Sequence, residues 1–494
     1  MYLVFCVLVS VMLQCMANGD YFVHLKPQDE MTTVSPQEYL SSHLDFLNEH
    51  VPHAHVYQVY WTLAERLGFY GYCVSISHNR SASILNVSSI IKSVEPIGVL
   101  SVAEIDMTMP SDKDVDETLS RFRKNRMAKS EVNLDSFYST EVDSRCVYDA
   151  NMFSTLTQPP SSDSVALNAS NPIFVYVVDT GIHSSHYSLR DSVDHEFDFE
   201  NRESSSHELF FRDPHGHGTQ VAGLIHQVCS NVRLVDVRVL GEDGTGRADD
   251  VVKGLEYIVE QYFFHKVDKG RLHSVINLSF SGKSSNFFKS VLYYISRILL
   301  VVGASGDEDT FSCEVAPSSS EFILSVGAAT WSSGLPLSGT NYGSCVRIRV
   351  AAENIVAPYI GADDTAMREI SGSSAATAFI SGVAAKVIAM IHSTPRAATA
   401  LYHKYPNLQK QRGMMEFVTD FLSLPLSHRM SGSHIVFSST CTLASTAHIS
   451  DHLVQLLQLN VQPDDASTGG RRAMQMVKNR FKATQRQRLE SNYE

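Results

Sequence analysis

The sequence has no excess of positive charge, few cysteines and no long apolar run after its first residues. Its 40 Lys and Arg are outnumbered by 53 Asp and Glu, which gives a net charge of −13. This balance argues against nucleic acid as the main partner, because phosphate groups would be repelled. No apolar run after residue 16 approaches the about 18 residues that a membrane-spanning helix requires. The sequence therefore predicts no transmembrane segment.

The most apolar part of the chain is its beginning. Met1 to Met16 is almost wholly apolar and is followed by polar residues. The stretch is too short to span a bilayer comfortably. Although it lacks Lys or Arg at its start, it is typical of a secretory signal peptide. We therefore expect a secreted or extracellular product.

Two of the eight cysteines lie in this predicted signal peptide, which leaves six. An even number of cysteines in an exported protein predicts disulfides, but six cysteines allow several pairings. The six are Cys73, Cys146, Cys229, Cys313, Cys345 and Cys441.

Three segments each place a polar side chain where an apolar segment meets a turn. A short apolar strand ends at Asp179, which Thr and Gly follow. A Gly-rich loop around His217 opens an Ala- and Val-rich helix. The sequence Gly-Ser-Ser ending at Ser374 opens another such helix, where free backbone N–H groups can stabilise an anion. A carboxylate, an imidazole and a hydroxyl are the set that nucleophilic acyl transfer needs.

Each of these residues alone also has an ordinary structural explanation. Ser374 could simply cap a helix, and Asp179 could cap a turn. His215 and His217 could form a metal site, but no Cys or carboxylate set at ligand spacing supports one. The occurrence of all three motifs in one chain favours catalysis.

With these motifs in the order Asp, His, Ser, the chain resembles the subtilases, and within them the proteinase K-like branch, over about residues 171–394. The resemblance implies a secreted serine endopeptidase in which Ser374 attacks, His217 transfers the proton and Asp179 orients the imidazole. It implies polypeptide substrates and no required cofactor. Subtilases often hold calcium, but no residue set here assigns a calcium site. The resemblance also implies a disulfide between Cys313 and Cys345.

The main departure from the family pattern is Asp307. Subtilases normally place Asn there, and its N–H₂ group donates to the oxyanion of the tetrahedral intermediate. An ionised Asp can only accept hydrogen bonds. Three interpretations follow. Asp307 is protonated during turnover and donates as a neutral acid, which favours acidic conditions, or the backbone N–H of Ser374 forms the oxyanion hole alone and the enzyme is slow. In the third, the chain is a catalytically impaired homologue that acts as a binding or regulatory protein.

Three further segments resemble the walls of a subtilase substrate cleft. The first resembles an edge that pairs with an extended substrate as an added strand. The other two resemble the wall and the floor of the primary specificity pocket, where small residues leave room for an apolar side chain. The segments are Gly244, Thr245 and Gly246; Ser279, Phe280, Ser281 and Gly282; and Ala304, Ser305 and Gly306.

Past residue 171, short apolar runs alternate with helical patterns. This alternation predicts a doubly wound α/β domain with a mostly parallel sheet and the active site at the carboxyl ends of its strands. Strands are expected at 173–178, 232–239, 275–280, 297–303 and 322–327, and helices at 249–262 and 287–295.

The segment before it has the pattern of a small α+β unit. Strands are expected at 21–25, 69–77 and 94–102, and helices at 36–50 and 81–92. This order resembles the ferredoxin-like propeptide that subtilases carry as an intramolecular chaperone and inhibitor. A permanent domain is the alternative.

These patterns divide the chain into five parts. The charged linker, residues 107–150, could hold a processing site or could be ordinary solvated surface. The basic tail, at the end of the C-terminal extension, could bind an acidic surface or be solvated. The parts are a signal peptide (1–17), a propeptide (18–106), a linker (107–150), a catalytic domain (151–394) and a C-terminal extension with a basic tail (395–494).

Overall fold

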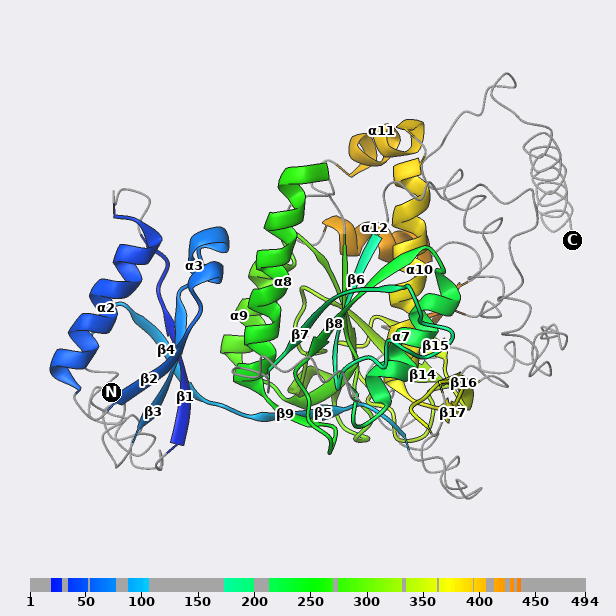
Figure 1. Ribbon diagram of the computed structural model, residues 1–494, viewed down its shortest axis with the longest axis horizontal. Coiled ribbons are helices and arrows are strands. Elements are labelled where there is room, and N and C mark those ends of the chain that lie inside the picture. Colours follow the sequence, from blue (N-terminus) through cyan, green and yellow to red (C-terminus); the bar gives the residue numbers. More distant parts are fainter. Residues whose placement is uncertain are drawn as a thin grey trace, which may run out of the picture.

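A computed structural model shows a small N-terminal unit beside a larger α/β domain (Figure 1). The segments expected to be the signal peptide, the linker and the basic tail lie outside the described residues. The structure describes residues 19–28, 34–51, 54–76, 88–105, 173–199, 213–269, 274–330, 335–361, 364–393, 395–405, 413–422, 427–430 and 433–436.

The large domain is organised around a nine-stranded sheet with the order β18-β19-β15-β14-β12-β10-β6-β8-β7. Every neighbouring pair is parallel except β18 and β19. The predicted doubly wound, mostly parallel α/β fold is therefore confirmed. The strands are β6 (Ile173–Asp179), β7 (Val193–Asp198), β8 (Val232–Arg238), β10 (Val275–Leu278), β12 (Leu300–Ala304), β14 (Leu324–Ala329), β15 (Ile348–Ala351), β18 (Ser427–Met430) and β19 (Ser433–Val436).

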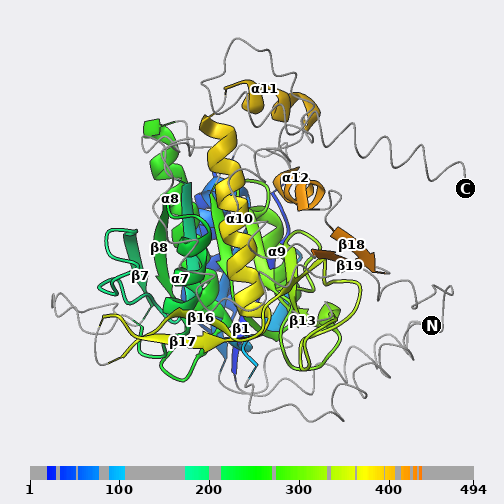
Figure 2. The ribbon, with the colours of Figure 1, turned by 90° about the vertical axis from the view of Figure 1, so that its right-hand side faces the viewer.

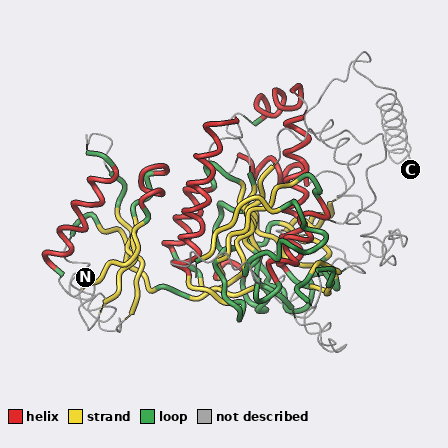
Figure 3. Tube along the Cα trace, viewed as in Figure 1, coloured by secondary structure: helices red, strands yellow, loops and turns green. Residues whose placement is uncertain are grey.

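Helices cover both faces of this sheet, as Figures 2 and 3 show. One face packs against α7 (His217–Val228) and α10 (Ser373–Ser393), and the other against α8 (Ala248–Lys269) and α9 (Asn286–Ile295). Strand β6 is buried along its whole length. Successive side chains of a strand point to opposite faces, so Val175 and Val177 join the first core while Tyr176 and Val178 join the second.

Helix α10 runs through the centre of the domain. Its segment Ser373–Ile391 is long and apolar enough to cross a membrane by composition alone, but 94% of it is buried inside the domain, as a core helix would be. Its small residues allow close packing: a Cβ added at Gly382 would lie 2.7 Å from Cβ of Val228 on α7. This contact fixes the distance between the two helices.

The described part of the chain after residue 394 packs onto the large domain. Helix α11 (Pro395–Lys404) follows α10 directly. Helix α12 (Gly413–Leu422) contributes Phe417 and Phe421 to the core around α10. Strand β19 extends the sheet beside β15.

The N-terminal unit is an antiparallel sheet with the order β2-β3-β1-β4 and two helices. The strands expected at 21–25 and 69–77 and the helix at 36–50 are present, but one strand and one helix were missed. The expected helix at 81–92 is wrong at its end, since β4 begins at Ile91, and 81–87 lie outside the described residues. The elements are β1 (Gly19–Leu25), α2 (Pro36–His50), β2 (Ala54–Val59), α3 (Trp61–Leu67), β3 (Gly71–Ile76) and β4 (Ile91–Pro96).

The single strand expected at 94–102 is instead two strands in two sheets. Strand β4 ends at Pro96 on the edge of the small sheet, where a proline costs no ladder hydrogen bond. Strand β5 (Val99–Val102) then joins the large domain, between β9 (Thr245–Arg247) and β11 (Phe280–Lys283), in a sheet that β13 (Val315–Ala316) completes. The chain therefore crosses from one unit to the other within three residues.

Aromatic packing joins the two units. The ring of Phe287, on α9, stacks on Phe22 of β1 with 4.1 Å between ring centroids and meets the edge of Phe69 at 5.2 Å. Each unit also caps a helix of the other. Glu256 on α8 accepts a hydrogen bond of 2.8 Å from the backbone of Thr62 at the start of α3. In return, Glu95 of the small unit accepts one of 2.7 Å from the backbone of Asn286, where α9 begins.

We predict that Phe287→Ala lowers the free energy of unfolding of the full chain by about 3 kcal/mol, because it removes a fully buried ring from between the units. Chemical denaturation measures this change. Phe264→Ala is the control, since Phe264 is 70% exposed on α8 and its loss should cost less than about 0.5 kcal/mol. Equal losses in the two variants would contradict the prediction.

Candidate active site

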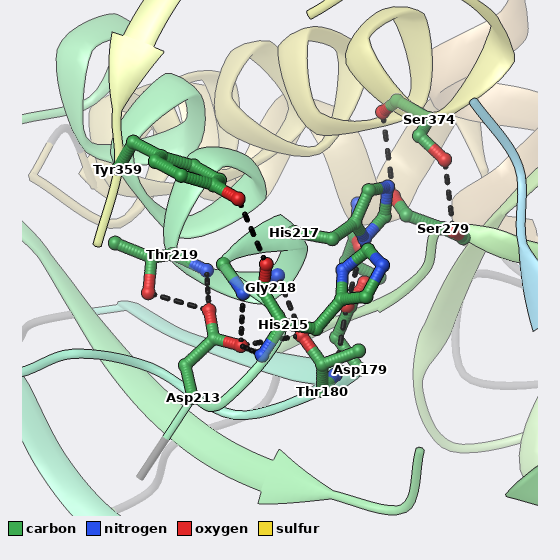
Figure 4. Close-up of polar contacts among 12 residues, drawn as sticks. Asp179, Thr180, Asp213, His215, His217, Gly218, Thr219, Ser279, Tyr359 and Ser374 are labelled. Carbon is green, nitrogen blue, oxygen red and sulfur yellow. Dashed lines mark hydrogen bonds and ion pairs between the residues drawn. The ribbon is translucent and has the colours of Figure 1, made fainter. Parts of the chain in front are cut away.

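The predicted acid and imidazole meet at the carboxyl end of β6. Asp179 is the last residue of β6 and His217 is the first of α7, and both side chains are fully buried. Nδ1 of His217 lies 2.8 Å from Oδ1 of Asp179 (Figure 4). A proton on Nδ1 donates to this carboxylate, which leaves Nε2 as an acceptor. Nε2 is buried and has no hydrogen-bond partner among the described residues.

The charge environment of His217 favours its protonated form. Burial alone would lower its pKa, but the charge and hydrogen bond of Asp179 oppose burial, and Glu104 and Asp213 add to them. The net result is a pKa above the ordinary value for histidine. His217 can therefore hold the proton of an attacking hydroxyl.

The loop before His217 is held by one buried carboxylate, Asp213. Its Oδ1 accepts hydrogen bonds from the hydroxyl of Thr180 (2.7 Å) and the backbones of His215 (3.2 Å) and Gly216 (2.7 Å). Its Oδ2 accepts from the backbone and the hydroxyl of Thr219, at 2.8 and 2.6 Å. Gly216 has a φ of +95°, a conformation that glycine adopts without strain. These bonds fix the entry into α7 and therefore the direction of His217.

Ser374 lies in the first turn of α10 and is fully buried. Its Oγ donates to the backbone carbonyl of Ser279 at 2.8 Å rather than to His217 (Figure 4). Its backbone N–H donates to the carbonyl of Ala103 at 3.2 Å. The structure thus brings Asp179 and His217 into contact, with the Ser374 hydroxyl turned toward Ser279.

Asp307 lies in the loop that follows β12 and approaches the start of α10. Its Oδ2 accepts hydrogen bonds from the backbone (2.8 Å) and the hydroxyl (2.9 Å) of Ser373. Its Oδ1 is buried without a hydrogen-bond partner, although the residue as a whole keeps some exposure. Burial raises the pKa of Asp307 to about 7, against the opposing effect of the two Ser373 hydrogen bonds. A substantial fraction of this carboxyl is therefore neutral near pH 7.

The predicted substrate cleft is occupied by the chain's own strand β5. The register pairs Ser101 with Thr245 on one side and with Ser281 on the other. Two backbone hydrogen bonds continue this pairing: Val102 donates to Gly244 (2.9 Å) and Ala103 donates to Ser279 (3.4 Å). The carbonyl of Ala103 then meets the backbone N–H of Ser374. An extended peptide can thus pair with both predicted edges at once and present a carbonyl to the start of α10.

The residues predicted to form the primary pocket lie on two facing segments. Ser279 and Phe280–Gly282 belong to the wall at β11, and Ala304 ends β12. Ser305 and Gly306 follow Ala304, and the backbone N–H of Gly306 donates to the hydroxyl of Ser373 at 3.2 Å. The predicted wall and floor therefore both contact the start of α10, at Ser374 and at Ser373.

Sequence reasoning assigned no role to several residues that the structure brings to this site. Asp213 stood inside the histidine motif, where its acidity was a usable signal. Glu308 and Asn341 carried no such signal, because their contact joins two loops 33 residues apart. Ala103 was placed in a separate unit, and only the structure brings it to Ser374.

The structure joins Cys313 and Cys345 in a disulfide, the pairing that the family resemblance implied. Cys73 and Cys229 are buried free thiols. Cys146 and Cys441 lie outside the described residues. No group of three or more metal-ligating side chains converges within the described part of the chain.

Comparison with known proteins supports the resemblance. A model of the subtilase family matches residues 170–405. The subtilase-type proteinase psp3 of Schizosaccharomyces pombe is 33% identical over 227 residues, which cover 45% of this chain and 48% of psp3. An extracellular serine proteinase of a Thermus species is 31% identical over 249 residues, which cover 49% of this chain and 57% of that protein. The chain thus spans about half the length of these relatives.

Among solved structures, a cold-adapted subtilisin-like serine proteinase is similar to this chain. It is 26% identical in sequence, with a TM-score of 0.42, and the match covers 54% of this chain and 88% of that one.

We predict that Asp213→Asn lowers the free energy of unfolding by about 2–4 kcal/mol, because the amide N–H₂ would face hydrogen-bond donors in a buried site. Chemical denaturation measures the loss, and the NMR titration of His217 reports whether its environment changes. Asp364→Asn is the control: its half-exposed carboxylate bonds to His183 and should contribute less than about 1 kcal/mol. An unchanged stability and an unchanged titration in Asp213→Asn would contradict the role assigned to Asp213.

Proposed function

Because the chain carries a domain of the subtilase family over residues 170–405, we propose that it is a serine endopeptidase that hydrolyses polypeptides through an acyl-enzyme on Ser374. The observation that carries this proposal is the buried hydrogen bond between His217 and Asp179, beside a backbone carbonyl bound to the N–H of Ser374. Together they supply a base, its orienting acid and a bound carbonyl.

In the proposed reaction, Oγ of Ser374 attacks the substrate carbonyl carbon while Nε2 of His217 accepts the hydroxyl proton. Asp179 stabilises the imidazolium through Nδ1. His217 then gives the same proton to the leaving amine, the peptide bond breaks, and the acyl group stays on Ser374 as an ester. Water repeats the sequence with His217 as base and releases the acid.

This chemistry requires Ser374 to leave the hydrogen bond to Ser279. A rotation about its Cα–Cβ bond redirects Oγ without moving the backbone, and serine side chains change rotamer readily. The unpartnered Nε2 of His217 is then the acceptor that this hydroxyl needs. Two observations, a base without a donor and a hydroxyl held by a carbonyl, support this movement.

Asp307 is proposed to act as a neutral acid in the oxyanion hole. Its Oδ2 already accepts two hydrogen bonds, so the proton of the neutral form belongs on the unpartnered Oδ1. Oδ1–H and the backbone N–H of Ser374 would then donate to the developing oxyanion. The loss of one such donor costs about 10² to 10³ in kcat, a magnitude that comes from subtilisin.

We further propose that the small N-terminal unit is an intramolecular inhibitor. Its strand β5 takes the place of a substrate strand, and the bond after Ala103 lies next to Ser374. The proposed self-cleavage site is therefore Ala103–Glu104, which precedes the linker at 107–150, where the sequence left a processing site as one of two alternatives. Release to the cell exterior is proposed from the apolar start of the chain and from the extracellular Thermus relative.

We predict that hydrolysis by the wild-type enzyme has a bell-shaped dependence on pH. Activity should fall as pH drops through the raised pKa of His217, because the base becomes protonated. It should also fall as pH rises through about 7, because Asp307 ionises and stops donating. Asp307→Asn donates at every pH, so its kcat/KM should exceed that of wild type by about 10² at pH 9. A pH profile of kcat/KM tests this, and a wild-type profile that stays flat from pH 7 to 9 would refute it.

We predict that the purified chain cuts itself after Ala103, and that Ser374→Ala stays intact. Sequencing of the new amino terminus should then give Glu104, and a fluorophosphonate probe should label Ser374. Ser284→Ala is the control and should cut itself at the wild-type rate, because its hydroxyl bonds to Ser319 outside the site. If wild type shows neither labelling nor hydrolysis from acidic to mildly alkaline pH, the chain is a catalytically impaired binding or regulatory protein. Cleavage at a bond within 107–150 would refute only the assignment of the site.

A further inference from the structure

The primary pocket, defined as the space between Ser279–Gly282 and Ala304–Gly306, is spanned by a side chain from a third segment. One carboxylate oxygen of Glu308 accepts a hydrogen bond from the hydroxyl of Ser281 on β11. The other accepts one of 2.5 Å from the amide of Asn341, and the Asn341 carbonyl oxygen accepts from the Glu308 backbone at 3.1 Å. The wall and the loop after the floor are thus linked across the pocket.

The two sides of the pocket are also too close for a large side chain. A Cβ added at Gly306 would lie 3.1 Å from Cβ of Ser281 and would clash with Asn341 and Glu308. Adding the C–C bond of about 1.5 Å places Cα of Gly306 no more than about 4.6 Å from Cβ of Ser281. An aromatic ring held between two carbon surfaces needs about 3.5 Å on each side, or about 7 Å in total. The gap between Ser281 and Gly306 therefore excludes a ring.

The register of β5 places the residue that would enter this pocket. Ser101 pairs with Ser281, so their side chains lie on the same face of the ladder. Ala103, two residues further, lies on that face too, whereas Leu100 packs in the core with Phe280. Ala103 is also the residue whose carbonyl meets Ser374, and it is only 2% exposed. The side chain next to the attacked carbonyl is thus a single methyl group.

Resting on the proposed endopeptidase function, we propose that Ser281 and Glu308 restrict this enzyme to polypeptides with a small residue, Gly, Ala or Ser, on the acyl side of the cleaved bond. The sequence had indicated room for an apolar side chain from the small residues that line the pocket. In the structure the Ser281 side chain faces Gly306 across that room, and the carboxylate of Glu308, an exposed residue, binds the Ser281 hydroxyl. A large side chain could enter only if both were displaced.

The first test uses the full chain and its own strand. Ala103→Ser should cut itself at the wild-type rate, whereas Ala103→Phe should do so at least tenfold more slowly. Adding Ser281→Gly to Ala103→Phe should restore most of the rate, because it removes the side chain that faces Gly306. Rescue by Ser281→Gly separates pocket size from a folding defect. Equal rates for Ala103→Phe and wild type at this bond would overturn the inference.

The second test measures kcat/KM of the self-cleaved enzyme on peptides that differ only in having Ala, Phe or Lys before the cleaved bond. Ala should exceed Phe and Lys by at least tenfold, and Ser281→Gly should raise the Phe-to-Ala ratio at least tenfold. This ratio does not depend on the fraction of active enzyme. Ser284→Ala, which loses only a hydrogen bond to Ser319 outside the pocket, should leave the ratio unchanged.

The outcomes separate this inference from the proposed function. A preference for Phe would overturn the inference and leave the endopeptidase function standing. A preference for Lys that disappears in Glu308→Gln would also overturn it. Such a result would mean that the Glu308 carboxylate leaves the Ser281 hydroxyl and pairs with the ammonium group of the substrate. No hydrolysis of any peptide and no labelling of Ser374 would overturn both.

Discussion

The hydrogen bond between Nδ1 of His217 and Oδ1 of Asp179 is the interaction on which the site depends. A fully buried carboxylate is costly unless it is paired, and this one is paired at 2.8 Å. The pairing needs two rigid supports: Asp179 lies at the end of β6, an interior strand of the sheet, and His217 lies at the start of α7. Asp213 connects these supports, because it holds Thr180 beside Asp179 and Thr219 beside His217. The remaining contacts of the site are arranged around this fixed pair.

Negative charge around the pair opposes the acyl transfer that we propose. The tetrahedral intermediate is an anion, and Asp307 and Glu308 both lie beside the loop that faces Ser374. A carboxyl that stays neutral resolves the conflict, since it donates where a carboxylate would repel. Burial supplies that neutrality to Asp307. Glu308 avoids the oxyanion differently, because Ser281 and Asn341 hold its carboxylate in the pocket.

The sequence predicted the parts of this molecule that depend on local pattern. Apolar runs identified the central strands. The motif at Asp179 identified the end of β6, and those at His217 and Ser374 identified the starts of α7 and α10. Contacts between distant loops leave no periodic pattern in the sequence. The hydrogen bond between the Ser281 hydroxyl and the Glu308 carboxylate was therefore not predictable. The strand at 94–102 was misjudged because its composition is uniform, whereas its two halves belong to different sheets. Elements whose position is set by tertiary partners, such as β5, cannot be located from periodicity alone.

The contacts between the two units also determine how the small unit, as the proposed inhibitor, would dissociate. Cutting Ala103–Glu104 removes the covalent link but leaves the Phe287 packing and both helix caps in place. Burial raises the pKa of Glu256 to about 7, against the opposing effect of the backbone hydrogen bonds that Thr62 and Leu63 of the small unit donate to it. Separation of the units must come from elsewhere, such as further cleavage of the small unit.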